Sequence, residues 1–177
     1  NEAEYALRVL DSESPENRGF PWVTEFEDKF CELSGAKYSI AVNSATSGLH
    51  AALVAAGVGP GDEVIQPALT VIMNSLVTIE CGAIPVFVDI NPDTWNIDTD
   101  SISKNITSKT KAIMAVSLFG LPLDIEPIIK SVVDDFNSIY NLKRGINISY
   151  KNDGKNKYFI YGIENRIEQI VANLLDN

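Results

Sequence analysis

Histidine and cysteine are scarce in this 177-residue sequence, which contains one histidine, His50, and two cysteines, Cys31 and Cys81. A single histidine gives little support for a metal site, and the cysteines lack the CxxC spacing of metal and redox motifs. Both cysteines lie in apolar, helix-like stretches, where a buried thiol is a better interpretation than a disulfide or a ligand. Neither metal chemistry nor a disulfide framework is therefore expected.

Positive charge is also scarce, because 14 basic residues stand against 24 acidic ones and give a net charge of −10. A negative surface repels phosphate backbones and anionic membranes, so nucleic acid is not an expected partner. No apolar run approaches the roughly 20 residues that cross a bilayer, and the first residues lack a basic start and a hydrophobic signal core. The sequence therefore predicts a soluble, cytoplasmic protein with no membrane partner.

The hydrophobic content of 45% is sufficient for a buried core. From Trp22 to Pro127, helix-like and strand-like segments alternate, with Gly and Pro at the changes. The expected helices cover residues 25–34, 45–57, 70–81 and 99–106, and the expected strands cover 38–44, 64–67, 85–90 and 111–119. This alternation predicts right-handed crossovers over a doubly wound parallel sheet.

The pattern changes near Ile128, where Asn, Lys, Tyr and Ile become frequent. A helix over 131–144 and a hairpin around Asp153-Gly154 are expected, followed by a helix over 164–177. That last helix runs to the terminus without a closing signal, which indicates a truncation. Two domains are predicted, 1–127 and 128–177.

The segment NSATSGLH, residues 43–50, passes from an expected strand directly into a helix. Backbone N–H groups at a helix start have no internal partners, and the helix dipole adds partial positive charge. Thr46 and Ser47 add hydroxyl donors, so the turn suits a phosphate group. Taken alone, ordinary helix capping by a hydroxyl residue is the better interpretation.

The order of segments around this turn resembles the start of the DegT/DnrJ/EryC1/StrS sugar aminotransferases. The resemblance runs through EFEDKFCELSGAKYSIAVNSATSGLHAALVAAGVGPGDEVIQPALT, GAIPVFVDINPDTWNID and TKAIMAVSLFGLP, and covers about residues 3–127. It implies an α/β fold: part of the large domain of a type I pyridoxal-phosphate transferase, a mostly parallel sheet with flanking helices, followed by an incomplete α+β segment. It also implies a nucleotide-linked keto-sugar substrate, an amino-acid donor and a homodimer.

The resemblance assigns the cofactor phosphate to Ala45 and Thr46, through backbone N–H groups and the Thr46 hydroxyl, with Ser47 in the same turn. After PALT the family usually has an aromatic residue that packs on the pyridine ring, whereas this sequence has Val71. An aliphatic, weaker ring contact is therefore expected. Asp89 and Asp98 are interpreted as turn and cap residues in preference to substrate contacts.

In this family, the Schiff-base lysine and the acidic partner of the pyridine nitrogen lie beyond the point where the resemblance stops. None of the lysines present stands in a family-like context, so no catalytic residue is assigned. The sequence predicts a truncated aminotransferase that is inactive as given.

The C-terminal part, from about residue 129, resembles instead the ATP-binding domain of histidine kinases. NLLDN matches an Asn box of the form NLLxN, with Asn173 and Asn177 four residues apart on one expected helix face. The resemblance implies amide oxygens that contact Mg-ATP. Three hypotheses follow: a truncated aminotransferase, a nucleotide-binding fragment of a sensor kinase, or a non-functional chimeric fragment. The junction near 126–130 is either a real fusion or an artefact.

Overall fold

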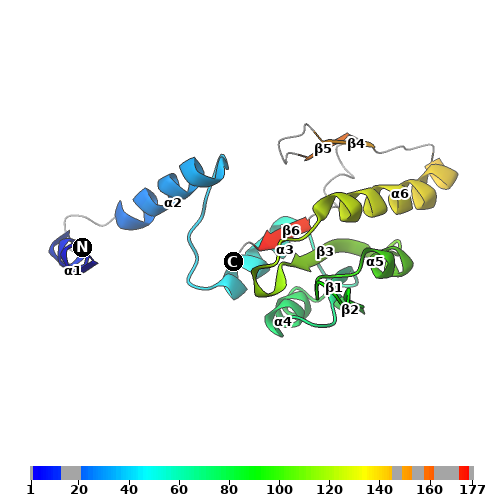
Figure 1. Cartoon of the computed structure of the whole chain (residues 1–177), viewed down its shortest axis with the longest axis horizontal. Helices are drawn as coiled ribbons and strands as arrows, with labels where there is room; N and C mark the ends of the chain where they lie inside the picture. Colours follow the sequence, from blue (N-terminus) through cyan, green and yellow to red (C-terminus); the bar gives the residue numbers. More distant parts are fainter. Residues whose placement is uncertain (1, 13–20, 145–148, 153–157, 162–171, 176–177) are drawn as a thin grey trace. The chain divides into compact units, whose positions relative to one another are not determined.

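A computed structural model describes residues 2–12, 21–144, 149–152, 158–161 and 172–175 (Figure 1). The chain divides into two compact units, Asn1–Ser44 and Ala45–Asn177. The first unit contains helices α1 (Glu2–Ser12) and α2 (Pro21–Ser34). The second contains the parallel sheet and its helices, and it provides the candidate site.

Helix α2 ends as the sequence predicts. Gly35 has a φ of +70°, and its N–H donates to the carbonyl of Cys31 at 2.9 Å. Glycine adopts this left-handed conformation without a Cβ clash, and so ends a helix readily. Phe26 and Phe30 lie one turn apart on α2, with ring centroids 6.3 Å apart. The helix begins four residues earlier than the expected start at residue 25.

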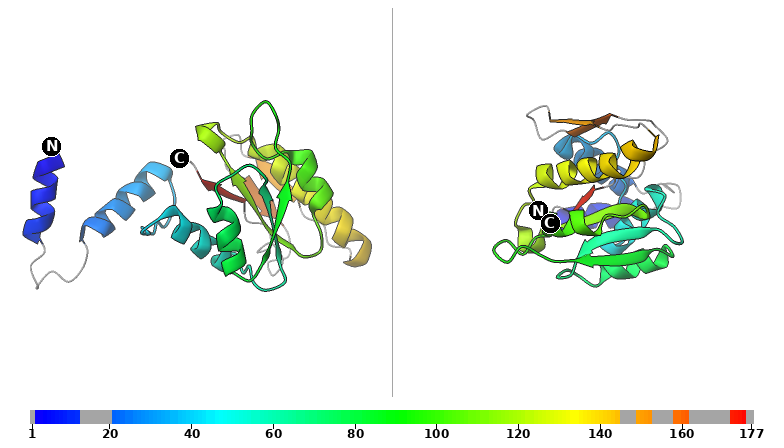
Figure 2. Two further views of the ribbon diagram at one scale, coloured as in Figure 1. Left: turned by 90° about the horizontal axis from the view of Figure 1, so that it is seen from below. Right: turned by 90° about the vertical axis from the view of Figure 1, so that its right-hand side faces the viewer.

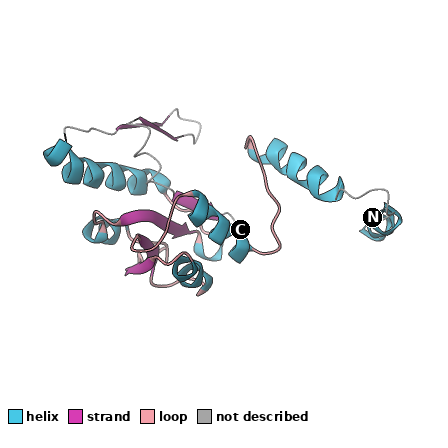
Figure 3. Ribbon diagram, turned by 180° about the vertical axis from the view of Figure 1, so that it is seen from behind, coloured by secondary structure: helices cyan, strands magenta, loops and turns pink. Residues whose placement is uncertain are grey.

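The strand expected over 38–44 is wrong, because the structure has a loop there (Figure 3). A strand needs a neighbour for its N–H and C=O groups, and the other described elements of this unit are helices. The Ala41 N–H instead donates to Oε1 of Glu27 at 2.7 Å. Ile40 is 81% exposed, so the apolar alternation that indicated a strand is not buried by this unit.

Four strands form the sheet of the second unit: β1 (Glu63–Pro67), β2 (Ile84–Val88), β3 (Thr110–Val116) and β6 (Ala172–Leu175). Their order is β2-β1-β3-β6, and every neighbouring pair is parallel. The parallel sheet expected from the alternating segments is therefore confirmed.

Helices cover both faces of this sheet: α3 (Ala45–Ala55), α4 (Met73–Glu80), α5 (Thr99–Asn105) and α6 (Ile125–Arg144). Successive residues of a strand point to opposite faces. Val64 of β1 accordingly joins a core cluster with Leu49 and Leu53 of α3, whereas Ile65 joins a second cluster with Ile102 of α5. Figure 2 shows α4 and α6 on opposite sides of the strands.

Glycines end two of the helices on the α3 side. Gly57 and Gly82 have φ values of +71° and +74°. After α3, the N–H of Val58 donates to the carbonyl of Leu53 at 3.0 Å, and the N–H of Gly57 donates to Val54 at 2.9 Å. These bonds satisfy carbonyls that a helix end leaves without partners. Both glycine stops were predicted from the sequence.

In the C-terminal part, α6 begins six residues before the expected start at residue 131, and the described strands test the other predictions. Strands β4 (Ser149–Asn152) and β5 (Tyr158–Tyr161) pair in an antiparallel manner, which confirms the predicted hairpin. The helix expected over 164–177 is wrong for residues 172–175, which form β6 beside β3. The edge of β3 presents unpaired N–H and C=O groups, and pairing with β6 satisfies them. The rest of 164–177 lies outside the described residues.

Helix α6 is continuous across residue 127, where the sequence predicts a domain boundary. Ile128 is 3% exposed and belongs to the same core cluster as Ile65. The division at 127 stays a prediction. The boundary between the two compact units of the structure falls between Ser44 and Ala45. In the described parts of the chain, no helix combines the length and apolar character needed to cross a membrane.

Candidate functional site

The carboxyl ends of the strands form one edge of the sheet. Pro67 pairs with Val88, and Ile65 pairs with Ile113, so β1, β2 and β3 end near the same level. The chain moves from β1 outward to β2 and then back past β1 to β3, so the strand order reverses between β1 and β3. In open parallel sheets, ligands bind outside the carboxyl ends at such a reversal. The loops after these three strands therefore form the candidate site.

The start of helix α3 lies at this edge. A short connection joins the end of α3 to the start of β1, so the helix runs antiparallel to the strand. The 11 residues of α3 and the 5 residues of β1 each span about 16 Å, which returns the start of α3 to the carboxyl level. The predicted phosphate residues Ala45, Thr46 and Ser47 occupy this first turn.

The first turn of α3 has the chemistry that an anion needs. It contains no acidic residue, so no carboxylate opposes the partial positive charge of the helix start. Thr46 and Ser47 are half-buried, and Ala45 is exposed. Leu49 and Leu53 fix the helix to the sheet because they are 4% and 3% exposed. The turn is thus accessible to a ligand, and the helix behind it is firmly packed.

Val71 lies in the loop that follows β1, at the same edge of the sheet. It is 58% exposed, and its carbonyl accepts a hydrogen bond from the N–H of Asn74 at 3.1 Å. The Asn74 side chain donates from Nδ2 to Oγ1 of Thr70 at 2.9 Å. These contacts hold the loop in a tight turn and leave the Val71 side chain open to a ligand.

A buried polar pair connects β1 to α4, and sequence reasoning missed it. Gln66 is fully buried and donates from Nε2 to Oγ of Ser75 at 2.6 Å. Its Oε1 has no hydrogen-bond partner in the described structure. The signal in the sequence was an amide inside the apolar strand VIQP, with a hydroxyl residue nine positions later.

We expect Ser75→Ala to lower the free energy of unfolding by about 1–3 kcal/mol, because it leaves the buried Nε2 group of Gln66 unpaired. Gln66→Met removes the amide and its unpartnered oxygen together, so it is expected to be neutral or stabilising. In the Gln66→Met background, Ser75→Ala should then cost much less. Urea unfolding of the four proteins of this cycle measures the difference, and equal costs of Ser75→Ala in both backgrounds would contradict it.

The loops after β2 and β3 are joined through Asn96. Its Nδ2 donates to the carbonyls of Leu121 and Pro122 at 3.2 and 3.4 Å, and its Oδ1 accepts from the N–H of Leu118 at 3.3 Å. Asn96 is 7% exposed. Beside it, Trp95 packs against Phe119, and both residues adopt positive φ. Sequence reasoning missed all of these contacts, since it treated NPDTW only as a turn.

Asp89 and Asp98, both in the loop after β2, differ in their contacts. Asp98 caps α5, because its Oδ2 accepts from the N–H of Ser101 at 2.9 Å, as predicted. The backbone carbonyl of Asp89 accepts from the N–H of Asp98 at 3.0 Å, and the Asp89 residue is exposed.

The histidine and the two cysteines do not form a metal centre in the described structure. Nδ1 of His50 lies 3.7 Å from Oε2 of Glu80, which links α3 to α4. Cys31 and Cys81 are free and half-buried. Burial, followed by the Glu80 carboxylate, raises the pKa of the Cys81 thiol. Among the residues that the structure describes, no group of three or more His, Cys, Asp or Glu side chains could hold a metal ion.

The Asn box is not arranged as the kinase resemblance implies. Asn173 lies on β6 and pairs with Met114 of β3, so it does not lie on a helix face. Asn177 is outside the described residues. Asn173 therefore does not present its amide on the helix face that the kinase resemblance implies.

Comparisons with known proteins identify relatives of this chain. The chain is 45% identical over 130 residues to GDP-perosamine synthase from Caulobacter vibrioides, covering 73% of this chain and 35% of that protein. An X-ray structure of the aminotransferase from Psychrobacter cryohalolentis is 36% identical with a TM-score of 0.70, covering 76% of this chain and 34% of that one. NtdA from Bacillus subtilis, solved with bound PMP cofactor, is 29% identical with a TM-score of 0.70 and covers 85% and 38% of the two chains.

This chain thus spans about a third of the length of the relatives that it matches. The structural likeness confirms the predicted fold class, part of the α/β type I fold of pyridoxal-phosphate enzymes. A family profile matches residues 1–135, which extends a little beyond the predicted limit at residue 127. The chain belongs to the DegT/DnrJ/EryC1/StrS aminotransferase family.

Proposed function

We propose that this chain supplies the cofactor-phosphate site of a pyridoxal-phosphate-dependent aminotransferase that acts on a nucleotide-linked keto-sugar. The observation that carries the proposal is the start of α3 at the carboxyl edge of the sheet, with Thr46 and Ser47 accessible and no acidic residue in the first turn. Family membership supports the cofactor, and the 45% identity to a GDP-perosamine synthase supports the substrate class.

The residues present fit the phosphate group of the cofactor. Backbone N–H groups of the first helical turn, including those of Ala45 and Thr46, would donate to phosphate oxygens, together with the Thr46 hydroxyl. Ser47 lies in the same turn, and Val71 would contact the pyridine ring through its aliphatic side chain. When bound, the cofactor supplies an electron sink for amino transfer, whereas this chain's residues bind and orient it.

We further propose that this polypeptide binds the cofactor but does not catalyse amino transfer. The resemblance places the Schiff-base lysine and the pyridine-nitrogen acid outside the motifs found here, so we expect cofactor binding without turnover. An amino-acid donor and a homodimer belong to the proposed full activity.

The test is a titration of the purified chain with pyridoxal phosphate, followed by absorbance, with inorganic phosphate as competitor. We expect saturable binding that Thr46→Ala weakens by roughly ten- to a hundred-fold, because a hydrogen bond to a charged group contributes about 1.5–3 kcal/mol. Ser108→Ala is the matched control, since Ser108 is an exposed hydroxyl residue just before β3, at the opposite edge of the sheet.

Equal affinity of the two variants would place the phosphate elsewhere, and no saturable binding would refute the site. Borohydride reduction followed by peptide mass spectrometry tests the second part of the proposal. Attachment to one defined lysine would contradict the expectation that this chain lacks turnover chemistry.

A further inference from the structure

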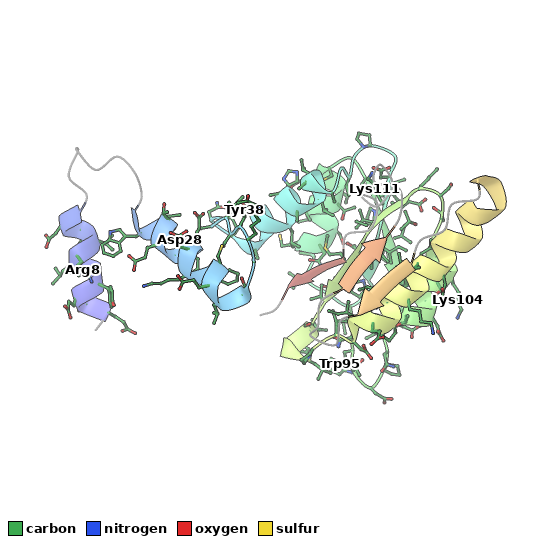
Figure 4. The ribbon with its side chains drawn as sticks, turned by 90° about the horizontal axis from the view of Figure 1, so that it is seen from above. Arg8, Asp28, Tyr38, Trp95, Lys104 and Lys111 are labelled. Atoms are coloured by element: carbon green, nitrogen blue, oxygen red, sulfur yellow. The ribbon has the colours of Figure 1, made fainter. Side chains whose placement is uncertain are left out.

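Two aromatic residues at the carboxyl edge have a backbone conformation that bulky side chains rarely adopt. Trp95 follows β2 with a φ of +60°, and Phe119 follows β3 with a φ of +55°. Among the described residues, they are the two that adopt positive φ without being glycine. Figure 4 shows Trp95 and Lys111 at opposite ends of the second unit, which agrees with a place for Trp95 at the carboxyl edge. Strained residues of this kind cluster at binding sites.

The two aromatic rings contact each other but stay open to solvent. Their centroids lie 5.9 Å apart in an edge-to-face arrangement, with 62° between the ring planes. Trp95 is 49% exposed and Phe119 is 85% exposed. Little of the Phe119 ring is removed from water, so hydrophobic burial within this unit does not offset the strain. The pair therefore suits contact with a partner, and tryptophan is among the residues that most often anchor protein interfaces.

The loops that carry the two rings are fixed before any partner arrives. The Trp95 N–H donates to the carbonyl of Asn91 at 2.7 Å, which closes a turn over residues 91–95. The side chain of Asn96 joins this loop to the one after β3, because its Oδ1 accepts from the N–H of Leu118, the residue before Phe119. A surface that is already fixed loses little conformational entropy on binding.

The surroundings of the aromatic pair are acidic. Asp93 lies inside the turn that the Trp95 N–H closes, its own N–H donates to Oδ1 of Asn91 at 2.9 Å, and it is exposed. In the described structure, no basic side chain forms an ion pair with Asp93. The loops that carry the rings, residues 89–98 and 117–124, contain no lysine or arginine but four carboxylates: Asp89, Asp93, Asp98 and Asp124. This field attracts cations and repels phosphate groups.

Arginine has the chemistry that matches both features. Its planar guanidinium stacks on an aromatic face and also donates to a carboxylate, whereas the lysine ammonium is a compact, strongly hydrated charge. A second copy of this chain does not match, since it brings the same acidic loops and a net charge of −10. Like charges that face each other across an interface are unfavourable. Charge complementarity therefore favours a basic protein segment.

We propose that the Trp95–Phe119 pair and Asp93 form a docking site for an arginine-bearing segment of a partner protein. The guanidinium lies on the exposed aromatic face and donates to the Asp93 carboxylate. No residue of the proposed cofactor site belongs to this surface, so the inference goes beyond the proposed function and does not depend on it.

The test uses the full chain with Trp22→Phe, so that Trp95 is the one remaining tryptophan and reports its own surroundings. The probe is the peptide acetyl-Gly-Arg-Gly-Arg-Gly-amide. The matched control peptide has citrulline, an uncharged isostere, in place of both arginines. We expect the arginine peptide to change Trp95 fluorescence saturably and to bind roughly ten-fold or more tightly than the citrulline peptide. Equal affinities, or no binding of the arginine peptide, would overturn the inference.

Variants of the aromatic pair locate the contact by calorimetry. Phe119→Ala should weaken binding of the arginine peptide roughly three- to thirty-fold, whereas Phe26→Ala, in the aromatic pair of α2, should leave it unchanged. Phe119→Gly removes the ring and also relieves the backbone strain, so it should weaken binding without loss of unfolding free energy. Equal binding by Phe119→Gly and the parent would overturn the inference even if Phe119→Ala failed to fold.

Charge variants separate this site from general attraction to an acidic protein. Asp93→Asn should weaken binding and reduce its salt dependence, because it removes a charge beside the rings and keeps the backbone N–H that bonds to Asn91. Asp28→Asn removes the same charge from an exposed position on α2 and should have little effect. Equal effects of the two substitutions would overturn the inference. Sedimentation of the chain without peptide tests the other occupant, since a dimer that Phe119→Gly dissociates would assign this surface to a second copy and overturn the inference.

Discussion

Leu53→Ala is expected to lower the free energy of unfolding by about 2–5 kcal/mol, one of the two largest effects that the structure predicts for a single substitution. Leu53 is 3% exposed and packs in the cluster that contains Leu49, Val64 and Val77. Removing its isobutyl group loses the transfer free energy of the buried atoms and leaves a cavity between α3 and the sheet.

Val54→Ala is the matched control. Val54 is the next residue on α3, but it is 57% exposed, so shortening it should change the unfolding free energy by no more than about 0.5 kcal/mol. Urea unfolding followed by far-UV circular dichroism measures both variants at one temperature. Similar costs for the two substitutions would show that α3 is not held against the sheet by its Leu53 face.

Leu53→Ala and Thr46→Ala together separate positioning of the proposed phosphate turn from contact with the phosphate. Leu53 anchors α3 near the end of the helix, whereas Thr46 lies in its first turn, where the phosphate is proposed to bind. Leu53→Ala should therefore reduce stability strongly and affect cofactor affinity through the loosened helix. Thr46→Ala should instead reduce affinity with little change in stability, because Thr46 is only half-buried.

Local signals in the sequence were sufficient for most of the second unit. The small-residue helix at 45–57, its stop at Gly57 and the following strand all appear where expected, because a glycine at positive φ and a period of hydrophobic residues depend on neighbouring residues alone. The helix start at Ala45 was predicted for the same reason, since its hydroxyl residues and its apolar period are contiguous in the chain, whereas phosphate binding by this turn stays a prediction.

Pairing between distant segments was not predictable in this way. Residues 38–44 have the alternation of a strand but have no strand partner in the described part of their unit. Residues 172–175 have a helix-like sequence, yet they pair with β3, which lies more than 50 positions earlier. In both cases, the outcome depends on which backbone edge is available, and a local pattern contains no information about that edge.

The side chains that organise the carboxyl edge were missed because their partners are remote. Gln66 meets Ser75 on the next helix, and Trp95 meets Phe119 from a different loop. A tryptophan in an Asn-Pro-Asp-Thr turn gives no local sign that its backbone is left-handed. An amide within the apolar strand at Gln66 was the one available signal, because a buried amide needs a partner.

Substitution of Asn96 is expected to have the second large effect on the free energy of unfolding. Asn96→Ala removes three hydrogen bonds that join the loops after β2 and β3, and it leaves the Leu118 N–H and two carbonyls without this partner. We expect a loss of about 2–4 kcal/mol in unfolding free energy, because each unmade buried bond costs about 1 kcal/mol or more. Asn105→Ala is the control, since among the described residues Nδ2 of Asn105 donates within its own helix, to the carbonyl of Ser101.

Asn96→Asp makes the prediction depend on pH. The introduced carboxylate can accept from the Leu118 N–H, but it faces the carbonyl oxygens of Leu121 and Pro122 and cannot donate to them. We expect burial to raise the pKa of this carboxyl above its unfolded value, so that its protonated form favours the fold at low pH and this advantage disappears as pH rises through the folded pKa. Relative to Asn96→Ala at each pH, Asn96→Asp should therefore be more stable near pH 4 than near pH 7. A pH-independent difference would show that Asn96 does not act through donation to these carbonyls, and that another contact holds the Trp95 and Phe119 loops together.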